Sequence, residues 1–186
     1  MTQSILPERP LASLIIRAKN EERWIGSCLN AVFSQSYKNF EVILVDNMST
    51  DRTLVKAQKY PIKLVTIEQF LPGKAINDGI RASKGDVVVC LSAHCVPVNE
   101  YWLENLIREL NDPEVAGVYG RQEPLSFTSD ADKRDLMITF GLDRKEQRKD
   151  SFFHNANSAI RRELLDATPF DESLTNIEDR FWAKQV

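Results

Sequence analysis

The chain has 186 residues, of which 24 are basic and 27 acidic, and its formal net charge at pH 7 is −3. This length suits one compact α/β domain and is enough to bury a substantial core. The charge balance gives no global basic field, so we expect no nucleic-acid partner. The longest apolar run, Val87 to Leu91, is far too short to span a membrane.

The first residues and the cysteines bear on where the protein works. Residues 1–10 are mixed and polar and lack the apolar core of a signal peptide. Cys28, Cys90 and Cys95 are odd in number and lack metal-ligand spacing, which favours reduced thiols. We therefore expect a cytoplasmic protein with an N-terminal lead over residues 1–10 and one domain over residues 11–186.

Strand and helix patterns alternate along the first two thirds of the chain. Short apolar runs predict strands over residues 11–16, 40–45, 63–67 and 86–91. Apolar residues at helical spacing and capping residues predict helices over residues 24–33, 50–60, 74–83 and 102–110. Asn20 is expected to cap the first helix, and Ser49 or Thr50 the second.

The alternation implies right-handed βαβ units in an open, mostly parallel sheet flanked by helices, an α/β fold of the Rossmann-like type. In such sheets ligands bind beyond the carboxyl ends of the strands. Three of the expected strands end in polar clusters, at residues 17–21, 46–51 and 92–94. The sequence therefore predicts a binding site at this edge of the sheet.

The pattern changes after residue 115. We expect a strand over residues 115–119, a charged helix over residues 130–148 and an extended segment over residues 152–160. The last residues, through Val186, look like the start of an amphipathic helix without a cap. We therefore expect that the natural protein is longer and that this domain is truncated at its C-terminus.

Five short segments together point to a known family. They are LIIRAKNE (residues 14–21), VDNMSTD (45–51), GKAINDG with ASKGD (73–86), NANSAIRR (155–162) and IEDRFW (177–182). In this order they resemble the motifs of the family 2 glycosyltransferases, which transfer a sugar from a nucleotide diphosphate with inversion at the anomeric carbon. The resemblance implies a GT-A fold and a UDP- or dTDP-sugar donor.

The resemblance also implies the donor-binding residues. Asp46 would accept a hydrogen bond from the nucleobase, although a turn residue that caps the next helix is the alternative interpretation. Lys74 would face the diphosphate, whereas Arg81, two helical turns further on, is expected to be a solvated surface charge. The pocket would be walled, mostly through backbone and Glu21 contacts, by Arg17, Ala18, Asn20 and Glu21.

One segment departs from the family pattern. Where the family has Asp-Ala-Asp, whose last Asp holds Mg²⁺ or Mn²⁺, this chain has Ser92, Ala93 and His94. A histidine is a competent ligand for Mn²⁺ but a poor one for Mg²⁺. Three interpretations stay open, in this order: His94 binds a divalent metal, His94 contacts the phosphates directly, or catalysis has been lost.

The resemblance assigns the acceptor side to two further segments. In the pair Glu178 and Asp179, Asp179 would be the general base that deprotonates the acceptor hydroxyl. The alternative is an acidic helix N-terminus capped by Asn176. The sugar and acceptor would be contacted by His154, Asn155 and Asn157, with His154 also a candidate second metal ligand or phosphate contact. Satisfaction of loop backbone groups is the competing role for these side chains.

The resulting hypothesis is an inverting glycosyltransferase acting on a sugar or lipid-linked glycan acceptor. The family setting implies bacterial surface polysaccharide synthesis at the inner face of the membrane, with peripheral membrane association through missing C-terminal elements. The alternative is a non-catalytic nucleotide-sugar-binding or scaffolding domain, favoured by the absent Asp-Ala-Asp and disfavoured by the intact Glu178 and Asp179. A sugar nucleotidyltransferase is less favoured, because no Gly-rich loop follows the first strand.

Overall fold

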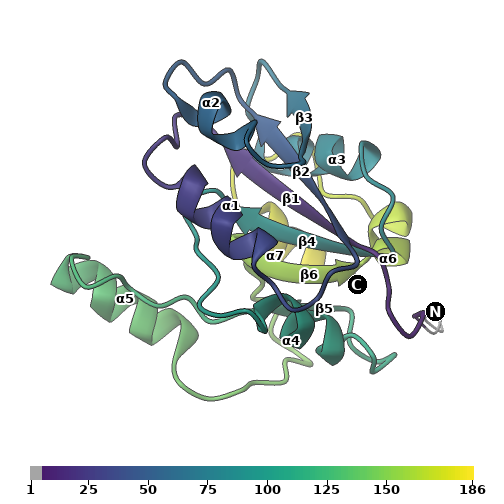
Figure 1. Cartoon of the computed structure of the whole chain (residues 1–186). Helices are drawn as coiled ribbons and strands as arrows, with labels where there is room; N and C mark the ends of the chain where they lie inside the picture. Colours follow the sequence, from purple (N-terminus) through teal and green to yellow (C-terminus); the bar gives the residue numbers. More distant parts are fainter. Residues whose placement is uncertain (1–5) are drawn as a thin grey trace.

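The computed structural model describes residues 6–186, so the first five residues of the expected N-terminal lead lie outside it. Six strands form one open sheet in the order β3-β2-β1-β4-β6-β5 (Figure 1). Neighbouring strands among β1 to β4 are parallel, whereas β6 is antiparallel to both β4 and β5. The expected open, mostly parallel sheet is confirmed. The strands are β1 (Ala12–Ala18), β2 (Phe40–Asp46), β3 (Lys63–Thr66), β4 (Val87–Ser92), β5 (Gly117–Tyr119) and β6 (Asn157–Arg161).

Helices cover both faces of the sheet. One face packs against α1 (Ile25–Phe33), α2 (Thr53–Ala57) and α4 (Trp102–Glu109). The opposite face packs against α3 (Pro72–Arg81), α6 (Arg162–Ala167) and α7 (Glu178–Ala183). The remaining helix, α5 (Asp130–Phe140), projects away from the body of the molecule (Figure 1).

The two faces divide the core because side chains alternate along a strand. Leu14 and Ile16 of β1 belong to the cluster under α1 and α4. Ile15, between them, belongs to the cluster under α3 and α7, together with Ile76 and Trp182. Both faces of β1 and β4 are therefore apolar, which explains the continuous apolar runs seen in the sequence.

Helix α3 lies unusually close to the sheet. A Cβ atom on Gly79 would lie only 2.5 Å from the Cγ2 methyl of Ile15 and 3.0 Å from that of Val45. The absence of a side chain at residue 79 therefore sets how near α3 approaches β1 and β2.

The expected helix caps were wrong. Helix α1 begins at Ile25 without a side-chain cap, and Asn20 instead adopts a left-handed conformation (φ 54°) in the preceding turn. Helix α2 begins at Thr53, whose backbone N–H donates to Asp51, not to Ser49 or Thr50. Short polar side chains serve turns as readily as helix ends, so local sequence does not decide between the two.

Three further element boundaries differ from expectation. The helix expected over residues 130–148 ends at Phe140, because Gly141 adopts a positive φ of 60°. Within the segment expected to be extended, only residues from Asn157 onward form a strand, and the short helix α6 was not predicted. Before α7, Ile177 rather than Asn176 occupies the capping position, with φ 56° and no side-chain cap.

Candidate active site

The polar strand ends meet at one edge of the sheet, as the sequence predicts. The parallel register sets Ala18 of β1 opposite Asp46 of β2. On the other side of β1, Arg17 lies opposite Ser92 of β4. Because β1 is flanked by β2 and β4, all three clusters lie side by side at the carboxyl edge.

Two of these clusters are joined by hydrogen bonds. The backbone N–H of Asn20 donates to Ser49 Oγ over 2.9 Å, and the N–H of Thr50 donates to Asn20 Oδ1 over 2.8 Å. The N–H of Glu21 donates to Thr53 Oγ1 over 2.7 Å. These contacts hold the loop after β1 against the loop after β2 and form a preorganised polar wall.

Asp46 is buried at the end of β2. Its carboxylate accepts hydrogen bonds from the Ser49 backbone N–H over 3.0 Å and from Ser49 Oγ over 2.5 Å. These are the contacts of a turn residue. A carboxylate offers about four acceptor positions, so these two hydrogen bonds leave capacity for a ligand.

His94, in the turn after β4, contacts the loop after β1. Its Nδ1 lies 3.0 Å from Glu21 Oε1, and its side chain is 58% exposed. Across residues 6–186, no cluster of three or more His, Cys, Asp and Glu side chains is placed to hold a metal ion. The donor set at the end of β4 therefore does not fit a divalent metal site built by side chains alone.

The acceptor-side segments meet at the same edge. The backbone N–H of Asn155 donates to Asp179 Oδ2 over 3.1 Å, and Asn155 Nδ2 lies 3.4 Å from Glu178 Oε1. Arg17 Nη1 lies 3.6 Å from the same Glu178 oxygen. Glu178 is buried, whereas Asp179 is partly exposed. The start of α7 is thus fixed beside the end of β1.

His154 is held by its neighbours in a hydrogen-bond accepting state. Its Nδ1 lies 3.3 Å from the Ala156 backbone N–H, which donates to it, and 3.1 Å from Gln122 Nε2. Burial lowers the pKa of His154 below its ordinary value, which favours the neutral ring. Gln122 was not predicted, because no motif marks the segment after β5.

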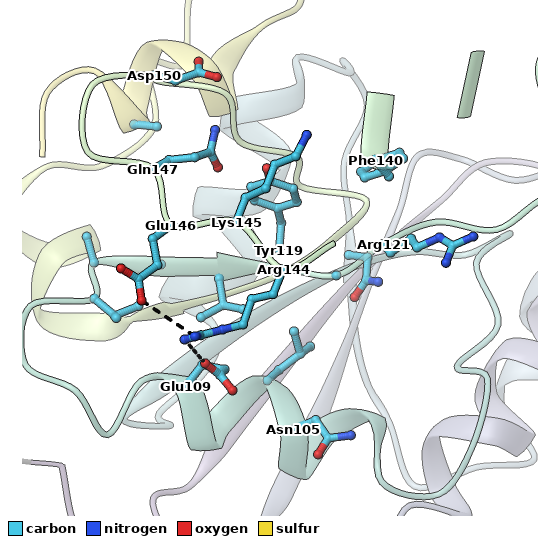
Figure 2. Close-up of a pocket in the computed structure, with 18 of the residues that line it drawn as sticks. Asn105, Glu109, Tyr119, Arg121, Phe140, Arg144, Lys145, Glu146, Gln147 and Asp150 are labelled. Atoms are coloured by element: carbon cyan, nitrogen blue, oxygen red, sulfur yellow. Dashed lines mark hydrogen bonds and ion pairs between the residues drawn. The ribbon is translucent and has the colours of Figure 1, made fainter. Parts of the chain in front are cut away.

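The side-chain oxygen of Asn157 makes a structural contact. Its Oδ1 accepts a hydrogen bond of 2.9 Å from Trp102 Nε1 of α4. Asn157 also lines an open cavity of about 1230 Å³ between α4, β5 and residues 141–151 (Figure 2). Within it Arg144 Nη2 lies 2.8 Å from Glu109 Oε2, which ties the 141–151 segment to α4.

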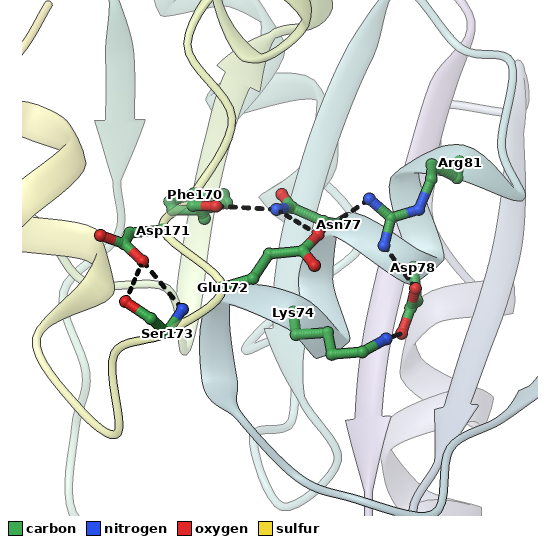
Figure 3. Close-up of polar contacts among 8 residues, drawn as sticks. All are labelled: Lys74, Asn77, Asp78, Arg81, Phe170, Asp171, Glu172 and Ser173. Carbon is green, nitrogen blue, oxygen red and sulfur yellow. Dashed lines mark hydrogen bonds and ion pairs between the residues drawn. The ribbon is translucent and has the colours of Figure 1, made fainter.

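Lys74 already has a partner on its own helix (Figure 3). Its Nζ lies 2.7 Å from Asp78 Oδ2, and Asp78 also pairs with Arg81 at 2.5 Å. Arg81 in turn lies 2.9 Å from Glu172, where hydrogen bonds from Arg81 and Asn77 lower the pKa of the Glu172 carboxyl. Arg81, expected to be a solvated surface charge, has a side chain that is 56% exposed and that pairs with both carboxylates.

The sheet defines a class of protein: α/β folds with an open, mostly parallel sheet, in which ligands generally bind beyond the carboxyl ends of the strands. The sequence pattern described as "Glycosyl transferase family 2" matches residues 13–168, most of the chain. The chain belongs to this family.

Two curated relatives illustrate the range of the family. A dolichyl N-acetyl-α-D-glucosaminyl phosphate 3-β-D-2,3-diacetamido-2,3-dideoxy-β-D-glucuronosyltransferase of Methanococcus voltae is 29% identical over 159 residues, which are 77% of this chain and 50% of that protein. The O-antigen chain rhamnosyltransferase WbaN of Salmonella anatum is 27% identical over 95% of this chain and 61% of its own length. The chain thus spans about half to three fifths of these relatives.

Solved structures share the fold. The mannosyltransferase PcManGT of Pyrobaculum calidifontis, in complex with GDP-Man and Mn²⁺, superposes with a TM-score of 0.74 at 24% identity, covering 98% of this chain and 54% of that one. Staphylococcus aureus TarS 1–349 in complex with UDP gives a TM-score of 0.72 at 22% identity, covering 92% and 53%. Among the residues that the structure describes, no helix is both long and apolar enough to cross a membrane.

Proposed function

We propose that residues 11–186 form the catalytic domain of an inverting glycosyltransferase that transfers a hexosyl or deoxyhexosyl group from a UDP- or dTDP-sugar to a hydroxyl acceptor. The observation that carries the proposal is the position of Asp179. Helix α7 holds its partly exposed carboxylate against Asn155, at the same strand ends where Asp46 and Glu21 form the polar wall. A carboxylate next to a donor pocket is the arrangement that a general base requires.

The reaction assigned to this site is a direct displacement. The acceptor oxygen attacks the anomeric carbon from the face opposite the leaving group, and a new C–O bond forms. The bond between the anomeric carbon and the diphosphate oxygen breaks, and its electron pair leaves with the nucleoside diphosphate. Asp179 takes the acceptor's proton, so charge and atoms balance and the configuration inverts.

The remaining side chains receive binding roles in this proposal. Asp46 binds the nucleobase through its spare acceptor positions. His94 and Lys74 lie on the diphosphate side, where positive charge stabilises the leaving group. On the acceptor side, Glu178 positions Asn155 next to Asp179. The Nδ2 group of Asn157, whose Oδ1 is held by Trp102, and the ring of His154 are assigned to contacts with the sugars. Ala18, Asn20, Ser92 and Ala93 are assigned to the same donor-binding region.

The biological role in this proposal is inferred from the names of the curated relatives. The names of several describe the synthesis of surface or lipid-linked glycans, in both bacteria and archaea. We assign this chain to bacterial surface polysaccharide synthesis at the inner face of the membrane, with a sugar or lipid-linked glycan as acceptor. The cavity beside β5, which Asn157 lines, is large enough to admit part of such an acceptor.

The test compares Asp179→Asn with Asp166→Asn, which changes an exposed carboxylate on α6. Release of nucleoside diphosphate is measured for a panel of UDP- and dTDP-sugars with simple sugar acceptors. We expect Asp179→Asn to lower kcat roughly 10²- to 10⁴-fold with donor affinity unchanged, and Asp166→Asn to match the wild type. Donor binding without turnover by the wild type would favour the non-catalytic alternative, and equal activity of both variants would refute the base.

A further inference from the structure

The end of β4 brings no negative charge to the expected diphosphate position. Ser92 is uncharged, and His94 is neutral or positive, so neither adds to the charge that a diphosphate carries. A dication is most valuable where fixed carboxylates and a diphosphate must be held together. The carboxylates at this edge, Glu21 and Glu178, already lie beside His94 and Arg17, so one well-placed side-chain cation can take the place of the dication.

Arg17 is such a cation. Its side chain leaves β1 directly opposite Ser92 and is 16% exposed. Its guanidinium has five N–H donors, yet its described contacts are limited to the 3.6 Å ion pair with Glu178. That separation is too long for a hydrogen bond, so the donors on Arg17 remain available to an incoming ligand.

Lys74, the cation that the resemblance assigns to the diphosphate, is already paired. It is engaged at 2.7 Å with Asp78, a carboxylate that Arg81 also holds. Binding a phosphate through Lys74 would weaken a close ion pair, whereas binding through Arg17 would fill donors that are not yet used. A planar guanidinium also matches two phosphate oxygens at once, which an ammonium does not.

We propose that the Arg17 side chain binds the donor diphosphate directly and offsets its charge without a divalent cation, with the His94 ring as a further hydrogen-bonding group. The sequence alone placed Arg17 in the wall of the donor pocket, mostly through backbone contacts, and gave its side chain no role at the diphosphate. The inference rests on the proposed function, because it concerns the donor of that same transferase. The ion pair with Glu178 then positions Arg17, and Arg17 links the leaving group to α7, the helix that carries Asp179.

Calorimetric titration tests the proposal directly. UDP, dTDP and GDP, and the corresponding nucleosides, are titrated into the wild type with EDTA and, separately, with Mn²⁺. We expect a nucleoside diphosphate to bind in EDTA with an affinity close to that in Mn²⁺. Arg17→Gln should weaken this binding roughly tenfold to a hundredfold and leave nucleoside binding unchanged, and Arg17→Lys should restore part of the loss.

The control is Arg134→Gln, which removes an exposed arginine from α5 and should bind like the wild type. Diphosphate binding that EDTA abolishes in the wild type would overturn the proposal without any variant. Equal binding by Arg17→Gln and wild type in EDTA would overturn the role of Arg17. In both cases the transferase would stand. If the folded wild type binds none of the three nucleotides under either condition, the proposed function itself fails.

Discussion

Gly79→Ala should destabilise the protein through the close approach of α3 to β1. The new methyl group would lie 2.5 Å from Ile15 Cγ2 and 3.0 Å from Val45 Cγ2, two branched side chains that are almost fully buried. Overpacking of this kind costs about 1–3 kcal/mol, and the better helix propensity of alanine returns roughly 0.5–1 kcal/mol. The net loss is up to about 2.5 kcal/mol, or a fall in Tm of up to roughly 10 °C for a chain of this size.

Gly26→Ala is the matched control, because a Cβ atom there would meet nothing within 4 Å. This change in α1 should leave Tm unchanged or raise it slightly. Thermal unfolding followed by circular dichroism, with urea unfolding as a second measure, compares both variants with the wild type. If Gly79→Ala proves as stable as Gly26→Ala, α3 does not pack against β1 as closely as the structure shows.

Two further predictions concern titratable groups. Burial lowers the pKa of His154 from 6.5, so the unfolded chain binds its proton more readily. The free energy of unfolding should therefore fall as the pH drops below about 6.5, and His154→Gln should lose less stability than the wild type between about pH 7.5 and about pH 5 in urea unfolding. An identical pH dependence would contradict this. Burial also raises the pKa of Cys95 to about 11 and that of Cys28 to about 12, so iodoacetamide at about pH 8 should alkylate both far more slowly in the folded than in the unfolded protein, as counted by mass spectrometry. Rapid alkylation of the folded protein would show that these thiols are open to solvent.

Some features of the site were available from local sequence. The i,i+4 spacing of Lys74 and Asp78 on a predicted helix is enough to anticipate their ion pair. The end of α5 before Gly141, which has a positive φ, could likewise have been expected from a glycine that follows a predicted helix. Neither feature needed knowledge of distant contacts.

Other features depended on residues far apart in the chain. His94 meets Glu21 across 73 positions, and Arg17 meets Glu178 only because α7 returns to the end of β1. Gln122 contacts His154 across 32 positions, and no sequence motif predicts this contact. Such contacts form when the sheet brings strand ends together, and a single sequence does not predict which residues will meet there.

The sequence by itself determined the alternation of strands and helices and the gathering of polar residues at the carboxyl edge. It could do so because side-chain periodicity is local and because parallel strands all end at the same side of a sheet. Only the tertiary structure decided which side chains at that edge are already paired and which are open to a ligand. Whether Arg17 or Lys74 has free donors depends on the carboxylates packed beside each, and that packing exists only in the folded chain.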